Sequence, residues 1–325
     1  MIDKLNRKID YMRISVTDKC NLRCVYCMPE KGIENIPHRE ILSYDEILRI
    51  CRCISDIGIR KIKITGGEPL VRKDIINLIR DIKSLDGIDQ VTLTTNGVLL
   101  YDMLDNLHSA GIDAINISLD TLDKEKFKMI TRRDEYESVI KSIHKCMDLG
   151  IKVKINCLAI KEHNLDEIIE IASFAKKYDI DVRFIELMPI GYGSKFTGIS
   201  NERILNLLEE HYGLFTRINE KRGNGPAIYY SNSEFKGCIG LISAITNEFC
   251  ETCNRVRLTS NGFLKLCLHY NKGIDLKGPM RNGISDRQLR DMIYHAIRNK
   301  PLGHNFFHED SLKDLEIKNM VQIGG

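Results

Sequence analysis

Short strand-like runs alternate with helix-like runs along the first 190 residues of the chain. The strand-like runs are MRISVT (12–17), KIKIT (61–65), VTLTT (91–95), AINISLD (114–120), KVKINCLAI (152–160) and DVRFIELM (181–188). Apolar residues at helical spacing predict helices near 45–56, 73–85, 101–108, 135–148 and 166–177. Strands that alternate with helices predict an α/β fold with a parallel sheet.

Polar and apolar residues alternate within these strands, so each strand has two unlike faces. In the second run Lys61, Lys63 and Thr65 lie opposite Ile62 and Ile64. The same alternation places polar side chains on one face of the other runs, among them Arg13, Asn116, Ser118 and Lys154. Parallel strands covered by helices on both faces are almost continuously apolar, and a closed barrel packs branched apolar residues inside. The pattern therefore favours a partial, open (β/α)6 TIM-like barrel with a polar lumen over an ordinary sheet with one exposed face.

The length of the chain indicates its domain organisation, and its net charge argues against nucleic-acid-binding and membrane-binding proteins. The 325 residues suit a barrel over 1–213 and a smaller carboxy-terminal domain over 214–325. Forty-eight basic and 45 acidic residues give a net charge of +3, which predicts neither nucleic-acid nor membrane binding. No run approaches the ~18 apolar residues of a membrane span, and no signal peptide is evident, so we expect a cytoplasmic protein. Eleven cysteines in a reducing compartment indicate metal or redox chemistry.

Three cysteines, Cys20, Cys24 and Cys27, follow the first strand with the spacing CxxxCxxC. Active sites of (β/α) barrels lie at the carboxyl ends of the strands. Three thiolates suit an iron–sulfur cluster and leave one iron of a four-iron cluster without a protein ligand. A zinc site completed by a distant residue is the alternative.

A second set of three cysteines lies in CETCNRVRLTSNGFLKLC, at Cys250, Cys253 and Cys267. Between them Arg255 and Arg257 share a strand face, and SNG predicts a hairpin turn. Two arginines beside a metal cluster suit a phosphate-bearing substrate. A structural zinc knuckle with solvated arginines is the alternative.

The spacing CNLRCVYC is similar to that of the radical S-adenosylmethionine (SAM) superfamily, and TGGEP at 65–69 resembles the loop that receives the SAM amino group. With the second cysteine set, the arginine hairpin and the final IGG, nearly the whole chain resembles the GTP 3′,8-cyclase family of molybdenum cofactor biosynthesis. The resemblance implies a lyase with two [4Fe-4S] clusters, one binding SAM and the other the guanine of GTP. A 5′-deoxyadenosyl radical would take the C3′ hydrogen of GTP, and the C3′ radical would attack C8 to give 3′,8-cyclo-7,8-dihydro-GTP. The implied partners are an electron-donating reductant and a downstream cyclic pyranopterin monophosphate synthase, with a homodimer left open.

Site residues carried over from that resemblance fall into four groups. The cluster ligands are Cys20, Cys24 and Cys27, and then Cys250, Cys253 and Cys267. The SAM-binding positions are Tyr26, Gly67, Glu68, Ser118 and Met188, of which Met188 is also explained as an apolar residue at a barrel end. The GTP-binding positions are Arg13, Lys63, Thr94, Lys154, Arg255 and Arg257. The catalytic positions are Arg255, Arg257, Gly324 and Gly325, where a frayed terminus is the alternative for the two glycines.

Lys63 departs from the family's usual residue, and Cys238 belongs to neither cysteine set. The family usually has arginine at the position of Lys63; lysine keeps the charge and loses the bidentate fork. Cys238 is assigned to the core, with proximity to the second cluster as the point to check.

Two rival functions stay open from sequence. A radical SAM peptide-modifying enzyme would usually carry more carboxy-terminal cysteines and lack the arginine hairpin. A zinc module that binds RNA is disfavoured by the balanced charge and by the lack of interleaved aromatic and basic residues.

Overall fold

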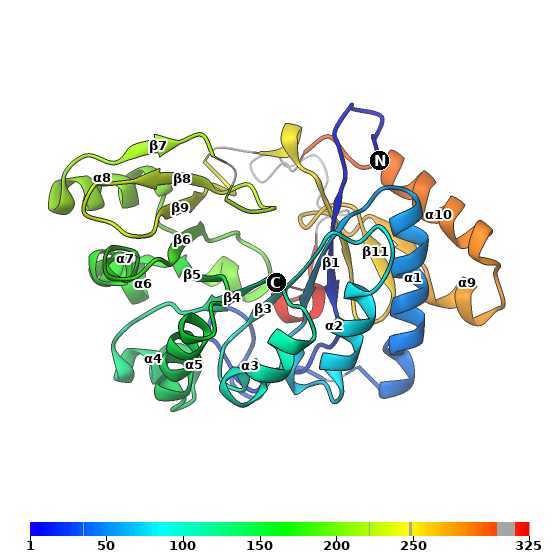
Figure 1. The fold of residues 1–325 in the computed structure, drawn as a ribbon, viewed down its shortest axis with the longest axis horizontal. Coiled ribbons are helices and arrows are strands. Elements are labelled where there is room, and N and C mark those ends of the chain that lie inside the picture. The colour runs from blue at the N-terminus through cyan, green and yellow to red at the C-terminus, as the bar shows by residue number, and fades with distance from the viewer. Residues whose placement is uncertain (35, 221, 247–248, 304–315, 325) are drawn as a thin grey trace.

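The computed structural model describes residues 1–325 except 35, 221, 247–248, 304–315 and 325. Its described strands form one sheet in the order β12-β11-β10-β1-β2-β3-β4-β5-β6-β9-β8-β7 (Figure 1). The strands are β1 (Tyr11–Ser15), β2 (Lys61–Thr65), β3 (Gln90–Thr95), β4 (Ala114–Ser118), β5 (Val153–Ala159), β6 (Asp181–Glu186), β7 (Thr216–Ile218), β8 (Ile228–Ser231), β9 (Ile239–Ile242), β10 (Arg255–Leu258), β11 (Phe263–Lys265) and β12 (Gly273–Asp275).

The six predicted strands are confirmed as β1 to β6, and neighbours in this series pair in parallel. Among the described residues β7 and β12 end the strand order without pairing to each other, so the barrel is open. The predicted partial barrel is therefore confirmed.

Most helices cover the outer side of the curved sheet, whereas the short helix near the carboxy terminus (red) lies within the barrel (Figure 1). The helices are α1 (Tyr44–Asp56), α2 (Ile75–Lys83), α3 (Leu100–Ser109), α4 (Lys124–Thr131), α5 (Tyr136–Asp148), α6 (Lys161–Asn164), α7 (Ile168–Lys177), α8 (Asn201–Tyr212), α9 (Lys277–Arg281), α10 (Asp286–Arg298) and α11 (Met320–Ile323). All five predicted helices are present, as α1, α2, α3, α5 and α7; α4, α6, α8, α9, α10 and α11 were not predicted. Local chemistry fixes their ends: Ser43 and Glu46 form a capping box at the start of α1, and Gly150 follows α5 with a positive φ of 66°.

The apolar faces of the strands form the core against these helices. Ile62 and Ile64 of β2 and Leu93 of β3 are fully buried in the main hydrophobic cluster. Because side chains alternate along a strand, burial of this face turns the polar residues of the same strands into the barrel. The alternation in sequence thus sets up both the core and the lumen.

The carboxy-terminal segment continues the same sheet at both of its ends. Strand β10 pairs in parallel with β1, with Arg257 opposite Arg13, and β9 pairs in parallel with β6. β10 and β11 form the predicted antiparallel hairpin. The division into units at 213/214 stays a prediction, since strands from both parts share one sheet.

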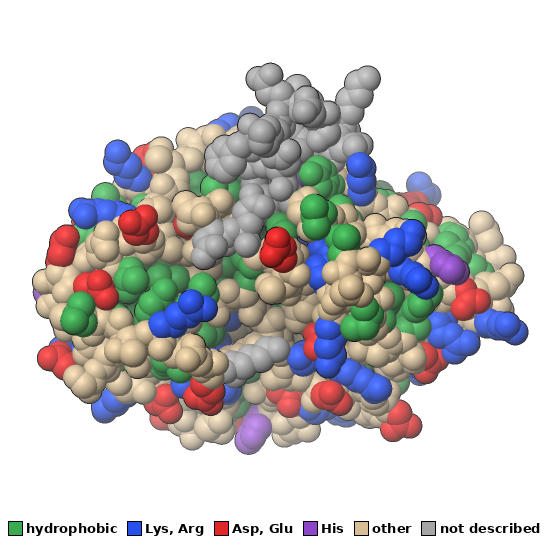
Figure 2. All heavy atoms as spheres, turned by 90° about the horizontal axis from the view of Figure 1, so that it is seen from above, with side chains coloured by type: hydrophobic (Ala, Val, Ile, Leu, Met, Phe, Trp, Pro, Cys, Tyr) green, Lys and Arg blue, Asp and Glu red, His purple; other side chains and the backbone are tan. Residues whose placement is uncertain are grey.

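On the outer surface, Lys and Arg side chains are interspersed with Asp and Glu (Figure 2). Within the described ranges, no helix has the length and apolar character that crossing a membrane requires.

We predict that Leu93→Ala lowers the free energy of unfolding by about 2–5 kcal/mol, because it removes fully buried atoms from the core and leaves a cavity. The matched control is Leu214→Ala at a side chain that is 83% exposed, where we expect a change within about 0.5 kcal/mol. Urea unfolding under anaerobic, reducing conditions measures both. Equal losses at the two positions would contradict the assignment of the core face.

Candidate active site

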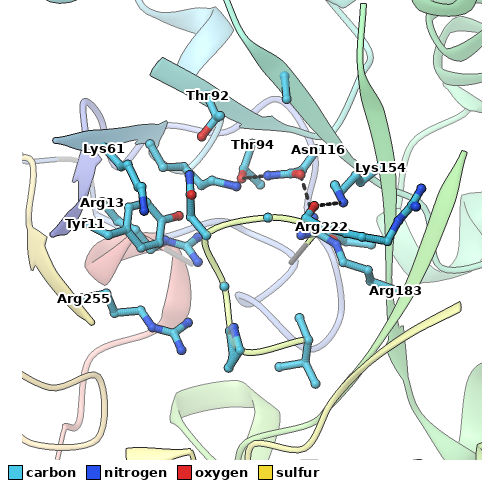
Figure 3. A pocket seen from close by; sticks show the side chains of 18 of the residues that line it. Tyr11, Arg13, Lys61, Thr92, Thr94, Asn116, Lys154, Arg183, Arg222 and Arg255 are labelled. Carbon is cyan, nitrogen blue, oxygen red and sulfur yellow. Dashed lines mark hydrogen bonds between the residues drawn. The ribbon is translucent and has the colours of Figure 1, made fainter. Parts of the chain in front are cut away.

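A cavity of about 330 Å³ occupies the barrel, and polar and cationic side chains from the strands point into it (Figure 3). Its strand residues include Arg13 of β1, Lys61 and Lys63 of β2, Thr92 and Thr94 of β3, Asn116 of β4, Lys154 and Asn156 of β5, Arg183 of β6 and Arg255 of β10. This is the polar lumen that strand parity predicted. Its charge is strongly positive, because no Asp or Glu is among the described residues that line it.

Some lumen cations have carboxylate partners at the amino ends of the strands. Lys61 donates to Asp10 at 2.9 Å. Lys154 forms a buried ion pair with Asp181 and donates to the Tyr229 hydroxyl at 3.0 Å. These pairs place the lysines at the lumen wall with part of their charge balanced.

The loop between β7 and β8 crosses this same end of the cavity (Figure 3). Arg222 Nε donates to Asp181 at 3.1 Å, and the Arg222 carbonyl accepts a hydrogen bond from Lys154. Asn224 donates to Gln90 at the start of β3. The loop over 222–226 therefore covers the amino end of the lumen.

The remaining lumen cations lie close to one another. Arg183 donates to Asn116 at 2.6 Å, a neutral acceptor. Burial, with Arg255 and Arg183 nearby, lowers the pKa of Arg13, and burial lowers the pKa of Lys63 well below its ordinary value. Buried charges of one sign are unfavourable unless an opposite charge joins them. The lumen is thus suited to a polyanion.

The first cysteine set lies in the loop after β1, at the carboxyl end of the strands. Cys20, Cys24 and Cys27 are half-buried free thiols. Burial raises the pKa of Cys20 to about 11 and of Cys27 to about 12. A metal centre favours the thiolate and reverses this effect. In the part of the chain that is described, no three His, Cys, Asp or Glu side chains converge as ligands of a single metal ion do. Cys24 interacts electrostatically with both Cys20 and Cys27, so the three thiols of this loop lie near one another and could hold one multi-iron cluster.

The second cysteine set lines a separate cavity of about 150 Å³ together with Arg13, Arg255, Arg257 and Met188. Burial opposes ionisation of Cys253, but Lys300 and Arg255 lower the pKa of this thiol to about 7. Arg255 also lies over the Phe249 ring, with 4.7 Å from its guanidinium carbon to the ring centroid. The donor set of Cys250, Cys253 and Cys267 in a cationic setting fits a second thiolate-bound cluster.

The carboxy-terminal tail enters the barrel. Arg257 Nη1 donates to the Gly324 carbonyl at 2.6 Å. Gly324 has a φ of +76°, and a Cβ there would lie 3.0 Å from Ser15 Cβ and 3.1 Å from Thr65 Oγ1. The tail is anchored upstream by a buried ion pair between Lys265 and Glu316. The terminal Gly325 lies outside the described residues.

Two of the predicted SAM positions, Gly67 and Glu68, lie beside the loop that carries the first cysteine set. Gly67 is closely packed, since a Cβ there would lie 2.3 Å from the Lys19 carbonyl oxygen. The buried Glu68 carboxylate accepts hydrogen bonds from the Leu70 N–H (3.0 Å), the Thr95 hydroxyl (2.7 Å) and the Asn96 N–H (2.7 Å). Glu68 therefore ties this loop to the end of β3, and its SAM contact stays a prediction.

Tyr26 lies between two of the cysteines, and its hydroxyl donates to Asp120 at 2.5 Å. Burial raises the pKa of Asp120 to about 6. Ser118 ends β4, the strand that leads to Asp120. Met188 follows β6 and lines the cavity of the second cysteine set. Tyr26, Ser118 and Met188 thus lie at or beyond the carboxyl ends of β1, β4 and β6.

Several residues of the site were missed from sequence. Arg183 shares the polar face of its strand with Asp181, so parity alone gave a signal for it. Arg222 and Tyr229 had no such signal, because a loop and a distant strand bring them to Lys154. Cys238 is buried and its neighbours are Arg222 and Asp181, at the other end of the barrel from the first cysteine set. Its assignment to the core agrees with this position.

Comparisons with known proteins cover the whole chain. The profile of the Radical SAM superfamily matches residues 14–175, and that described as Molybdenum Cofactor Synthesis C matches residues 180–306. The chain is 47% identical over 325 residues to a GTP 3′,8-cyclase of Clostridium perfringens, with 100% of both chains covered. It is also 47% identical over 329 residues to a GTP 3′,8-cyclase of Desulforamulus reducens, again with 100% of both covered.

Among solved structures, the chain is similar in fold to Streptococcus suis SuiB bound to S-adenosylmethionine. The TM-score is 0.64 at 19% sequence identity, over 90% of this chain and 68% of that one. At this identity the likeness concerns the fold alone.

We predict that Gly324→Ala lowers turnover at least about tenfold, because the added Cβ would strain the backbone and displace the carbonyl that Arg257 holds. Gly283→Ala is the control: its φ is +84°, but a Cβ there meets nothing within 4 Å. Both variants carry the cost of a left-handed alanine, so only the first should lose activity. Equal activity of the two variants in a product assay would contradict a role for the tail.

We also predict that replacing Cys20, Cys24 and Cys27 together with alanine leaves about half of the wild-type iron and sulfide, and that the same change at Cys250, Cys253 and Cys267 does likewise. Cys146→Ala, at a buried thiol of α5, should keep the full content. Iron, sulfide and zinc analysis of anaerobically reconstituted proteins measures this. Zinc in place of iron at either set would overturn the cluster assignment for that set.

Proposed function

The chain belongs to the GTP 3′,8-cyclase family of radical SAM enzymes, and from this premise we propose how its residues divide the work. The enzyme is a lyase that converts GTP to 3′,8-cyclo-7,8-dihydro-GTP in the first step of molybdenum cofactor biosynthesis. It uses SAM and two [4Fe-4S] clusters. The assignments to individual side chains that follow are proposals.

Cys20, Cys24 and Cys27 hold the cluster that, when bound, supplies the electron for cleavage of SAM to methionine and the 5′-deoxyadenosyl radical. Gly67 allows the backbone of its loop to approach the methionine part of SAM. Glu68 fixes that loop against β3 through its three hydrogen bonds. Tyr26, held by Asp120, positions the segment between two of the cysteines.

GTP spans the two cavities in our proposal. Its support is that Arg13, Ile185, Ile242 and Arg255 line both the cationic lumen and the cavity of the second cysteine set. One molecule with an anionic end and a flat base can therefore place its anionic end in the cationic lumen and its base in the adjoining cavity. The triphosphate lies among the lumen cations, and the guanine faces Cys250, Cys253 and Cys267.

The lumen residues bind and orient the substrate. Arg13, Lys63 and Lys154 neutralise the phosphates, and Thr94 adds a hydroxyl. Arg257, which holds the Gly324 carbonyl, keeps the tail beside the reacting sugar. Fixing the ribose in this way brings C3′ of GTP to the radical, since positioning is the main demand of hydrogen transfer.

An external reductant and a downstream cyclic pyranopterin monophosphate synthase complete the proposal. The product is an intermediate, so an enzyme that rearranges it must follow. We place this sequence of reactions in the cytoplasm, where thiolates stay reduced.

Isotope transfer tests the proposed site of attack. We predict that the reconstituted enzyme, with SAM, dithionite and GTP deuterated at C3′, yields 5′-deoxyadenosine that carries deuterium. GTP deuterated at C2′ is the control and should transfer none. Mass spectrometry of 5′-deoxyadenosine distinguishes the cases. Unlabelled 5′-deoxyadenosine from the C3′ substrate would remove C3′ as the hydrogen donor and leave SAM cleavage intact.

A further inference from the structure

Lys63 occupies the middle of β2, where its side chain faces the lumen and is 9% exposed. Its neighbours in register are Arg13 on β1 and Thr92 on β3. Neither Arg13 nor Thr92 can neutralise the positive charge of the Lys63 ammonium as a carboxylate would. The position is therefore buried, central and without an adjacent anion on the paired strands.

The groups around Lys63 are mostly cations. The charged and titratable groups that face this part of the lumen are Tyr11 and Arg13 from β1, Lys61 from its own strand, Lys152 and Lys154 from the start of β5, Arg183 from β6, Arg222 from the loop after β7, and Arg255 from β10. The nearest carboxylates are already engaged. Asp10 accepts from Lys61 at 2.9 Å and from Asn254 at 2.8 Å, and Asp181 pairs with Lys154 and Arg222.

No hydrogen bond or ion pair reaches the Lys63 ammonium from the residues that the structure describes. This separates Lys63 from Lys61, two residues away on the same face of the same strand. Lys61 has its carboxylate, whereas the described charged groups that act on Lys63 are the cations Arg183, Arg13, Lys154 and Arg255. The two lysines form a matched pair within one strand.

Repulsion among these buried cations is lowered if one of them loses a proton, and lysine is the side chain that can do so. Arginine stays protonated in proteins, and Lys154 is held in its ion pair. Burial, followed by the charges of Arg183, Arg13, Lys154 and Arg255, lowers the pKa of Lys63 well below its ordinary value. The free-energy cost of a charged Lys63 disappears once phosphate oxygens lie beside it.

We propose that Lys63 is an uncharged amine in the empty lumen and takes up a proton when the phosphate chain of GTP enters. This inference rests on the proposed function, because it places that phosphate chain in the lumen. A proton is then a co-ligand of the substrate. An arginine at this position would carry its charge permanently, so the lysine makes the charge of the site depend on its occupant.

The dependence on pH has a definite sign. Above the pKa of Lys63 in the empty lumen, GTP must bring a proton with it, so its affinity falls by about tenfold per pH unit. Below that pKa the amine is already protonated, and the affinity is independent of this group. Ligands with fewer phosphates stabilise the protonated form of Lys63 less. Their binding should therefore be accompanied by uptake of a smaller fraction of a proton.

Isothermal titration calorimetry with GTP measures the proton directly. The enzyme carries both clusters in their oxidised form, and no reductant is present, so GTP binds without turnover. Titrations at pH 8.5 in buffers of different ionisation enthalpy give the number of protons taken up. At this pH the terminal phosphate of GTP is fully ionised, since the second pKa of such a phosphate is about 6.

We expect the wild-type enzyme to take up about one proton per GTP. Lys63→Arg should take up almost none and bind GTP with a Kd that is steady between pH 7.5 and 8.5, below the range in which the guanine base itself ionises. Lys61→Arg, at the paired lysine of the same strand, should keep the wild-type proton uptake. Lys63→Gln is the second variant, in case the arginine does not fit: it should bind GTP more weakly, again without proton uptake.

Three outcomes would overturn the inference. Wild-type binding whose heat does not depend on the buffer shows that no proton enters with GTP. Equal uptake by wild type and Lys63→Arg or Lys63→Gln places the proton on another group. In both cases GTP still binds, so the proposed function stands. Absence of GTP binding to the wild-type enzyme at every pH would overturn the proposed function, and this inference with it.

Discussion

Positive charge enclosed within the barrel is the constraint around which the rest of the molecule is arranged. A cationic interior is costly in a folded protein unless an anion or solvent balances it. The outer faces of the same strands offset that cost, because Ile62, Ile64 and Leu93 are fully buried against the helices. Stability and substrate binding thus come from opposite faces of each strand. A substitution on one face leaves the chemistry of the other face largely in place.

The alternation of polar and apolar residues along the strands allowed much of this arrangement to be predicted from the sequence. Six strands, five helices and the polar lumen followed from periodicity, and Arg13, Lys63, Thr94 and Lys154 lie where parity put them. Arg183 carried the same signal and was overlooked. Such positions are predictable because the two-residue period of a strand is a local property of the chain.

Long-range contacts were not readable in this way. Nothing local in the sequence indicates that Arg222 and Tyr229 approach Lys154, or that Glu316 pairs with Lys265. The role of Glu68 as a brace of its own loop was also unforeseen, because a carboxylate gives no sign of which N–H groups it will meet. Pairing of β9 and β10 with the barrel likewise depends on tertiary structure and not on any period in the chain.

The position of β10 beside β1 has a consequence for biosynthesis. Arg257 lies opposite Arg13, so the first strand of the barrel finds this neighbour only after most of the chain has left the ribosome. Until then β1 has an open edge of the kind that invites pairing with other chains. The second cysteine set is on the segment that closes this edge. A nascent chain therefore acquires its substrate pocket and covers the edge of β1 in the same folding step, and truncated translation products retain that aggregation-prone edge.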